Sequence, residues 1–188
     1  MQNYFKKESP EALVFQSKIE NIPGGITVAV KDLTQTRIKA GTPVGMDANG
    51  LYHVVKTARV QTKAESAETG YKVEKGHNFK AGDILALGAK GYAITGIDTS
   101  NANFDILTVG TTLGVAEVGA VLFEGNKSAA SAVTFKYSPI ALVGTTFDVL
   151  PGDNHLTDGV VRGSVKEKNI GAPISDAIKA ALPLIRFV

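Results

Sequence analysis

The chain contains three histidines, and histidine is the side chain most suited to acid–base chemistry and metal binding near neutral pH. They are His53, His77 and His155. None lies at metal-ligand spacing from another histidine or a carboxylate, and the sequence has no His-Glu-x-x-His motif. His53 also falls within a short apolar segment typical of a β-strand. We therefore expect the histidines to have structural roles.

Three aspartates near the end of the chain could instead suggest a calcium loop. Asp148, Asp153 and Asp158 surround the sequence Pro-Gly-Asp-Asn at residues 151–154. Their spacing does not match an EF-hand loop, and Pro, Gly, Asp and Asn are the residues that ordinary turns favour. This segment is predicted to be a turn.

Other motifs that carry chemistry are missing from the sequence. The glycine-spaced stretch 110–125 lacks the Gly-Lys-Ser/Thr ending of a phosphate loop, and no Gly-x-Ser-x-Gly elbow occurs. With no cysteine, the chain has no thiol nucleophile, disulfide or thiolate-bound metal. We predict that the protein is not an enzyme, with no catalytic, cofactor-binding or metal-binding residues and no cofactor.

Composition narrows the class of protein further. The 188 residues are 44% hydrophobic and 20% charged, which favours a folded chain over a disordered one. The 20 Lys and Arg residues nearly balance 18 Asp and Glu residues, so we expect no nucleic-acid partner. No segment approaches the roughly 18 apolar residues of a membrane span, and the first ten residues lack the apolar core of a secretory signal.

The charges are unevenly distributed along the chain. Residues 1–80 carry a net charge of +4 (12 basic, 8 acidic), residues 81–125 carry −4 (1 basic, 5 acidic), and residues 126–188 carry +2 (7 basic, 5 acidic). Basic ends and an acidic middle could guide association between copies. The same pattern also fits an ordinary solvated surface.

The elements that would position any site are mainly β-strands. Apolar stretches rich in Val, Ile and Thr are short and end at Gly, Asn, Asp or Pro, which is the strand-and-turn pattern. Asn49-Gly50 indicates a hairpin, because both residues tolerate positive φ. The predicted strands are 26–30, 51–55, 91–97, 106–109, 119–123, 132–137, 140–143, 147–150 and 160–165. Long polar runs at 57–77, 98–103 and 126–131 are predicted to be loops or hairpin tips.

The chain also contains an internal repeat. Residues 38–50 (IKAGTPVGMDANG) recur as residues 79–91 (FKAGDILALGAKG), with Lys, Ala, Gly, Ala and Gly shared at a fixed offset. The repeat predicts two similar hairpins, over 38–55 and 79–97. Two copies are too few for a solenoid, so we expect a small β-barrel or β-sandwich in which both hairpins pack around one core.

Helix is predicted clearly at one place, near the end of the chain. Ser175 suits the N-cap, Asp176 favours the first turn, and Pro183 stops a helix over 175–182. The apolar residues 184–188 that follow are expected to dock, either on their own domain or across a neighbouring subunit. A weaker helix is predicted at 10–16.

These elements define a domain plan. We predict an N-terminal arm at residues 1–18, which is either a tether to a partner or a flexible leader. Residues 19–188 then form a single β-rich domain that ends in the helix and apolar tail at 173–188.

The order of the pieces resembles head decoration or head fibre proteins of tailed phages and prophages of Bacteroidetes-type hosts. The resemblance runs over residues 19–188, and the segments that carry it are 22–25 (IPGG), 38–50, 79–87 (FKAGDILAL), 98–119 and 161–188. It implies a structural virion protein, made in the host cytoplasm, that forms a homotrimer. It also implies that the trimer binds the major capsid protein at the outer capsid surface. The resemblance brings no catalytic residues.

Two other classes of function remain open, a carbohydrate- or host-surface-binding domain and an enzyme, whereas a carrier domain lacks its modified lysine. Residues 80–86 (KAGDILA) also resemble a hairpin limb of biotinyl and lipoyl carrier domains, but no Met-flanked lysine is present to be modified. A carbohydrate- or host-surface-binding β-domain would need exposed aromatic residues, and Tyr52, Tyr71 and Tyr92 are the candidate set. An enzyme of the barrel-sandwich type would need an acid–base pair at His53 or His77.

Overall fold

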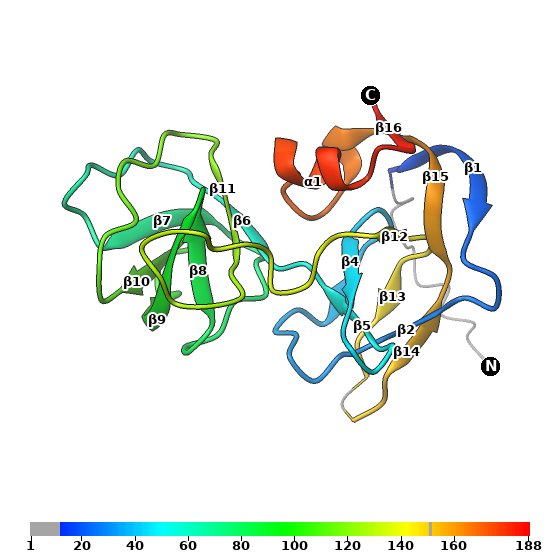
Figure 1. Cartoon of the computed structure of the whole chain (residues 1–188), viewed down its shortest axis with the longest axis horizontal. Coiled ribbons are helices and arrows are strands. Elements are labelled where there is room, and N and C mark those ends of the chain that lie inside the picture. The colour runs from blue at the N-terminus through cyan, green and yellow to red at the C-terminus, as the bar shows by residue number, and fades with distance from the viewer. Residues whose placement is uncertain (1–11, 151) are drawn as a thin grey trace, which may run out of the picture.

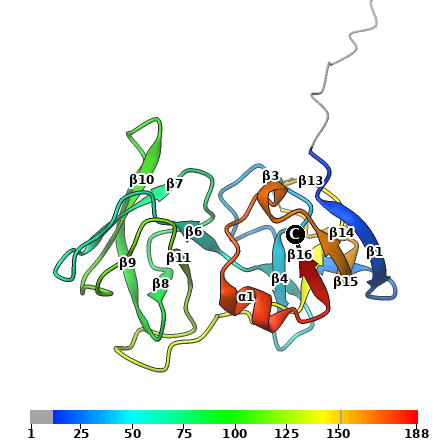
Figure 2. The ribbon, with the colours of Figure 1, turned by 90° about the horizontal axis from the view of Figure 1, so that it is seen from above.

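The computed structural model describes residues 12–150 and 152–188, which form two lobes that lie side by side (Figures 1 and 2). We call the lobe that contains both ends of the described chain the body lobe. The lobe built from residues 57–124 is the insert lobe. The chain is mainly β, with curled sheets that form half-barrels and one short C-terminal helix, which confirms the predicted fold class.

The body lobe is formed by strands from before and after the insert. They are β1 (Phe15–Asn21), β2 (Ile26–Val28), β3 (Arg37–Ile38), β4 (Pro43–Met46), β5 (Tyr52–Val54), β12 (Ala141–Val143), β13 (Phe147–Asp148), β14 (His155–Thr157), β15 (Gly159–Val165) and β16 (Ile185–Phe187), with the 3-10 helix η1 (Glu167–Asn169) and the helix α1 (Asp176–Ala181). The main sheet runs β1-β15-β12-β4-β5-β2-β14, with β16 added beside β15. Because β12 lies between β4 and β15, the two halves of the chain share one sheet.

The insert lobe contains a sheet of its own. Its strands are β6 (Thr57–Arg59), β7 (Gly70–Glu74), β8 (Ile84–Leu87), β9 (Lys90–Asp98), β10 (Phe104–Val109) and β11 (Val121–Glu124), in the order β6-β11-β8-β9-β10-β7. An antiparallel bridge between Val60 and Val73 joins the two ends of this order, so the sheet curls around a core. Tyr71, Leu85 and Leu107 are fully buried in that core.

Both predicted repeat hairpins are present, but they lie in different lobes. The first contains β4 and β5, which pair around Asn49-Gly50, and it packs in the body core through Val44 and Val54. The second contains β8 and β9 and packs in the insert core. They therefore do not share one core, because the chain leaves the body lobe directly after β5.

The glycines of the repeat are only partly equivalent. Gly41 and Gly82 both adopt the left-handed conformation, with φ of +83° and +93°, so this turn is repeated. The next pair differs, since Gly50 is left-handed and Gly91 lies within β9. At Gly91 a Cβ atom would come within 3.0 Å of the Val133 side chain, so close packing explains that glycine.

Most predicted strands are present, and the structure adds β14, which lies outside the predicted strands. Three further differences concern predicted elements. Residues 132–137 form no strand, because Ala132 has a left-handed φ of +56° that interrupts an extended backbone. The run 57–77, predicted as a loop, contains β6 and β7. The described part of the helix predicted at 10–16 is not helical, and Gln16 lies in β1, where pairing with β15 determines the backbone.

The C-terminal tail docks on its own lobe. The Ser175 side chain accepts a hydrogen bond from the Ile178 backbone N–H (3.3 Å), which confirms the predicted N-cap. Ile178 and Ile185 are buried beside β15, with which β16 pairs in parallel. This is one of the two predicted alternatives for the tail.

The N-terminal arm predicted at residues 1–18 falls only partly within the described residues. Residues 1–11 lie outside them, and residues 15–18 belong to β1. In both views β1 lies at the end of the molecule away from the insert lobe (Figures 1 and 2).

Candidate functional site at the junction of the lobes

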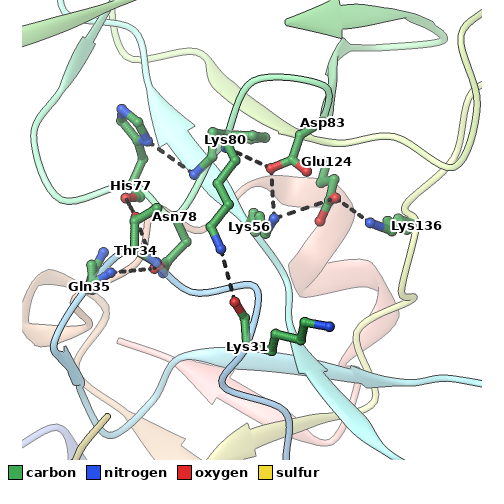
Figure 3. A network of polar contacts seen from close by, with 11 residues as sticks. Lys31, Thr34, Gln35, Lys56, His77, Asn78, Lys80, Asp83, Glu124 and Lys136 are labelled. Atoms are coloured by element: carbon green, nitrogen blue, oxygen red, sulfur yellow. Dashed lines mark hydrogen bonds and ion pairs between the residues drawn. The ribbon is translucent and has the colours of Figure 1, made fainter. Parts of the chain in front are cut away.

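A buried lysine lies where the chain passes from the body lobe to the insert lobe. Lys56 stands between β5 and β6, and only 4% of its side chain is exposed. Its Nζ donates a hydrogen bond to Oδ2 of Asp83 (2.7 Å) and lies 3.7 Å from Oε1 of Glu124, as Figure 3 shows. An ammonium group this deeply buried needs such partners, because burying an unpaired charge is very costly.

The turn before β8 positions Asp83. In this Lys-Ala-Gly-Asp turn, Oδ2 of Asp83 also accepts a hydrogen bond from the Lys80 backbone N–H (2.8 Å). Gly82 supplies the left-handed residue of the turn, and the Ile94 backbone N–H bonds to the Asp83 carbonyl (2.8 Å). Local backbone contacts therefore hold the carboxylate against Lys56.

Glu124 is the second carboxylate of the cluster and lies at the end of β11. Its side chain is 3% exposed, and Oε1 accepts a hydrogen bond from Lys136 Nζ (2.7 Å). Oε2 is buried without a hydrogen-bond partner. Burial raises the pKa of Glu124, and the contacts with Lys136 and Lys56 only partly oppose that shift.

These four groups connect the two points at which the chain crosses between lobes. Lys56 is on the outgoing crossing, and Lys136 is on the segment that returns from β11 to β12. For Lys136, burial acts to lower the pKa, but the hydrogen bond and charge of Glu124 outweigh it and raise the pKa. Two cations and two carboxylates thus form a compact cluster at the base of the insert lobe, which we call the junction cluster.

Further hydrogen bonds tie the lobes together beside the junction cluster. Oδ1 of Asn78, in the insert lobe, accepts from the backbone N–H groups of Thr34 and Gln35, both at 3.1 Å. Lys80 Nζ donates to the Lys31 carbonyl (3.0 Å), as Figure 3 also shows. A cavity of about 200 Å³ adjoins these contacts.

The three histidines occupy unrelated environments. His53 lies 3.3 Å from Asp47 and stacks on Tyr137, with ring centroids 4.0 Å apart. His155 stacks on Phe147 at 3.9 Å. These two histidines do not lie in one site.

His77 is the most buried histidine and lies close to the junction. Its Nδ1 accepts a hydrogen bond from the Phe79 backbone N–H (3.2 Å), and its Nε2 lies 3.3 Å from Asp105, which also binds Lys75 (2.6 Å). Burial lowers the pKa of His77, and the charge of Lys75 adds to that effect, while Asp105 opposes it. The imidazole is enclosed by these groups and supports the fold locally.

The three aspartates near the end of the chain also have separate contacts. Asp148 pairs with Arg37 (3.2 Å), and the Asp158 carbonyl accepts from the Gly144 N–H (2.7 Å). Asp153 lies in an exposed turn. In the described part of the chain, no group of three His, Cys, Asp or Glu residues could hold a metal ion.

The three tyrosines proposed for carbohydrate binding do not lie together. Tyr52 is in the body lobe, whereas Tyr71 and Tyr92 are in the insert lobe. Tyr71 is fully buried, and its hydroxyl accepts from the Leu113 N–H (2.7 Å). These three residues therefore form no common binding surface.

Sequence reasoning missed the junction cluster except for the turn that contains Asp83. A signal was present, since Lys56 follows Val54-Val55 and Glu124 follows Val121-Leu122-Phe123. A charged residue at the end of an apolar strand indicates a buried ion pair only when its partner is known. Here Asp83 lies 27 positions from Lys56, and Lys136 lies 12 positions from Glu124.

Comparison with models of protein families, with curated proteins and with solved structures finds no match for this chain. No helix among residues 12–150 and 152–188 has the length and apolar character needed to cross a membrane.

Proposed function

We propose that the protein is a non-enzymatic structural virion protein. It would decorate or cement the outer surface of a phage capsid as a homotrimer bound to the major capsid protein. The order of sequence segments resembles that class of protein.

The observation that carries the proposal is that the main sheet of the body lobe ends in two edge strands, β1 and β14, which have no further strand beside them in the described residues. Within the described residues β1 pairs only with β15, and β14 pairs only with β2. Each edge exposes a large aliphatic side chain, Ile19 (63% exposed) on β1 and Leu156 (66% exposed) on β14. Open strand edges with exposed apolar residues favour pairing with another chain.

Two different edges allow a closed ring. If β1 of one copy lies beside β14 of the next, the contact is head-to-tail, and a rotation of one third of a turn closes a trimer. Such a ring would bury both aliphatic side chains and leave the insert lobes at its periphery.

Sedimentation and capsid binding test this proposal. We expect the purified chain to sediment as a trimer and to co-sediment with empty capsids assembled from the major capsid protein of its phage or prophage. Leu156→Lys should give a monomer, because a lysine at an open edge opposes pairing. Val118→Lys is the matched control, since Val118 is similarly exposed (65%) but lies in the insert lobe.

Two results would contradict the proposal. If the wild-type chain is monomeric at micromolar concentration, the proposed trimeric ring is wrong. If the chain is a trimer but does not bind capsids, the proposed virion role is wrong and only the self-association stands.

A further inference from the structure

The junction cluster places a lysine amine, an aspartate carboxyl and a buried glutamate in one site. We propose that Lys56 and Asp83 become joined by an intramolecular isopeptide bond between Nζ of Lys56 and Cγ of Asp83, and that Glu124 moves the protons in this reaction. The proposal concerns the chain alone and is independent of the virion role.

The geometry brings the reacting groups together without any movement of the lobes. Lys56 Nζ is 2.7 Å from Asp83 Oδ2 and 3.7 Å from Glu124 Oε1. The turn hydrogen bond from the Lys80 N–H holds the Asp83 carboxyl, and Lys136 holds Glu124 from its other side. Groups fixed in this way reach effective molarities of about 10⁵–10⁸ M, which favours a condensation that is unfavourable between free molecules in water.

The reacting side chains are largely withdrawn from solvent. The side chains of Lys56 and Glu124 are 4% and 3% exposed, and Asp83 is 15% exposed. On the side of His53 and Tyr137 the space beside Lys56 and Glu124 amounts to about 10 Å³, whereas on another side Lys56 lines the cavity of about 200 Å³. Burial of the three side chains limits the access of bulk water to the reacting atoms.

The reaction is balanced by the groups present. One proton passes from the Lys56 ammonium through Glu124 to Asp83, which leaves a neutral amine facing a neutral carboxylic acid. The amine nitrogen attacks Cγ and forms the C–N bond. A second proton then moves from nitrogen through Glu124 to the departing hydroxyl, the C–O bond breaks, and water leaves. The products are one amide and one water, and Glu124 ends in its starting state.

The bond would close a loop between two residues 27 positions apart, at the base of the insert lobe. A cross-link stabilises mainly by restricting the unfolded chain. In a chain without cysteine, the isopeptide bond would provide this restriction in a form that reducing agents do not reverse.

Intact-mass spectrometry of the purified full-length chain is the decisive experiment. We expect a mass lower than the sequence mass by one water molecule. A tryptic digest should contain a linked pair of peptides that carry Lys56 and Asp83, with no cleavage after Lys56. The unmodified sequence mass, unchanged after long incubation of the folded chain at neutral pH, would overturn the proposal.

Variants then assign the roles of the three groups. Lys56→Arg should retain its full mass, and Asp83→Asn should lose ammonia instead of water while giving the same linked peptides. Glu124→Gln should retain its full mass over the same incubation, and loss of water at the wild-type rate would disprove the role of Glu124. Lys75→Arg is the control, because it alters another close ion pair, Lys75–Asp105 (2.6 Å), and should still lose water.

Discussion

His77 is a residue whose burial makes the stability of the fold depend on pH. Its pKa is lowered below the usual 6.5, chiefly by burial. Below that pH the unfolded chain binds a proton that the folded chain resists, so folding stability must fall as the pH falls. Asp105 and Lys75 face the same imidazole, and Asp105 limits the effect because it favours the protonated ring.

We therefore predict that His77 lowers the free energy of unfolding as the pH is lowered from about 8 to about 5, because its pKa is lower in the folded chain than in the unfolded one, whereas the raised pKa of Glu124 acts in the opposite direction. Urea unfolding followed by circular dichroism measures this dependence. His77→Asn should flatten the profile, whereas His155→Asn should leave it as in the wild type. Equal pH profiles for His77→Asn and the wild type would contradict the assignment.

At Gly163 the close approach of a neighbouring backbone leaves no room for a side chain. A Cβ atom at Gly163 in β15 would lie 2.4 Å from the Ser17 carbonyl oxygen of β1. Backbone cannot move aside as a flexible side chain can, so we predict that Gly163→Ala destabilises the fold by about 1–3 kcal/mol. Gly96→Ala is the control in another strand, since a Cβ atom there would meet no side chain or backbone atom of another segment within 4 Å. Chemical denaturation of both variants measures the difference, and equal midpoints would refute the steric explanation.

At the scale of elements, the C-terminal helix and strand are part of the body core. Ile178 on α1 is fully buried, and Ile185 on β16 is 6% exposed. We predict that Ile178→Ala costs about 2–5 kcal/mol of stability, the usual range for a fully buried aliphatic residue. Leu184→Ala, at a site 58% exposed, should change stability by less than about 0.5 kcal/mol. A thermal melt that shows similar shifts for both variants would mean that α1 does not belong to the core.

The elements also show what local sequence could and could not predict. The hairpin at Asn49-Gly50 and the helix capped by Ser175 depend on neighbouring residues, and both were predicted correctly. β7 and β6 were missed because their apolar residues are few and separated by polar ones. Tyr71 and Val73 are buried only because β10 pairs with β7 across a long sequence separation.

The candidate site depends on such separations even more strongly. Lys56, Asp83 and Glu124 lie on three segments that are brought together by the pairing of β11 with β6 and β8. Each residue alone resembles an ordinary charged surface position. The repeat revealed the turn at Asp83, but nothing near it in the sequence points to Lys56.

At the scale of the whole molecule, the insert lobe is attached through a small number of polar contacts. The chain enters it beside Lys56 and leaves it beside Lys136, and Glu124 contacts both cations. Phe135 packs against core residues of both lobes. The two cores are therefore separate but mechanically connected, and the strength of that connection decides whether the lobes unfold together.

Asn78 provides the way to test this connection. Its side chain, 6% exposed, accepts hydrogen bonds from two backbone N–H groups of the body lobe, those of Thr34 and Gln35. Asn78→Ala would remove both hydrogen bonds, and each such bond contributes about 0.5–1.5 kcal/mol to stability. That loss falls on the contact between lobes and not on either core. We predict that calorimetry of the variant resolves two unfolding transitions, or one whose van't Hoff enthalpy is well below its calorimetric enthalpy.

Asn126→Ala is the matched control for this prediction, because the Asn126 side chain accepts from Thr134 within a single exposed loop (3.2 Å). It should leave the transition unchanged in shape and nearly unchanged in midpoint. If Asn78→Ala lowers the midpoint but keeps one two-state transition, the lobes are coupled mainly by Phe135 and the junction cluster. Lys56→Arg combined with Asn78→Ala should then separate the transitions, since the double variant also removes any covalent link at residue 56.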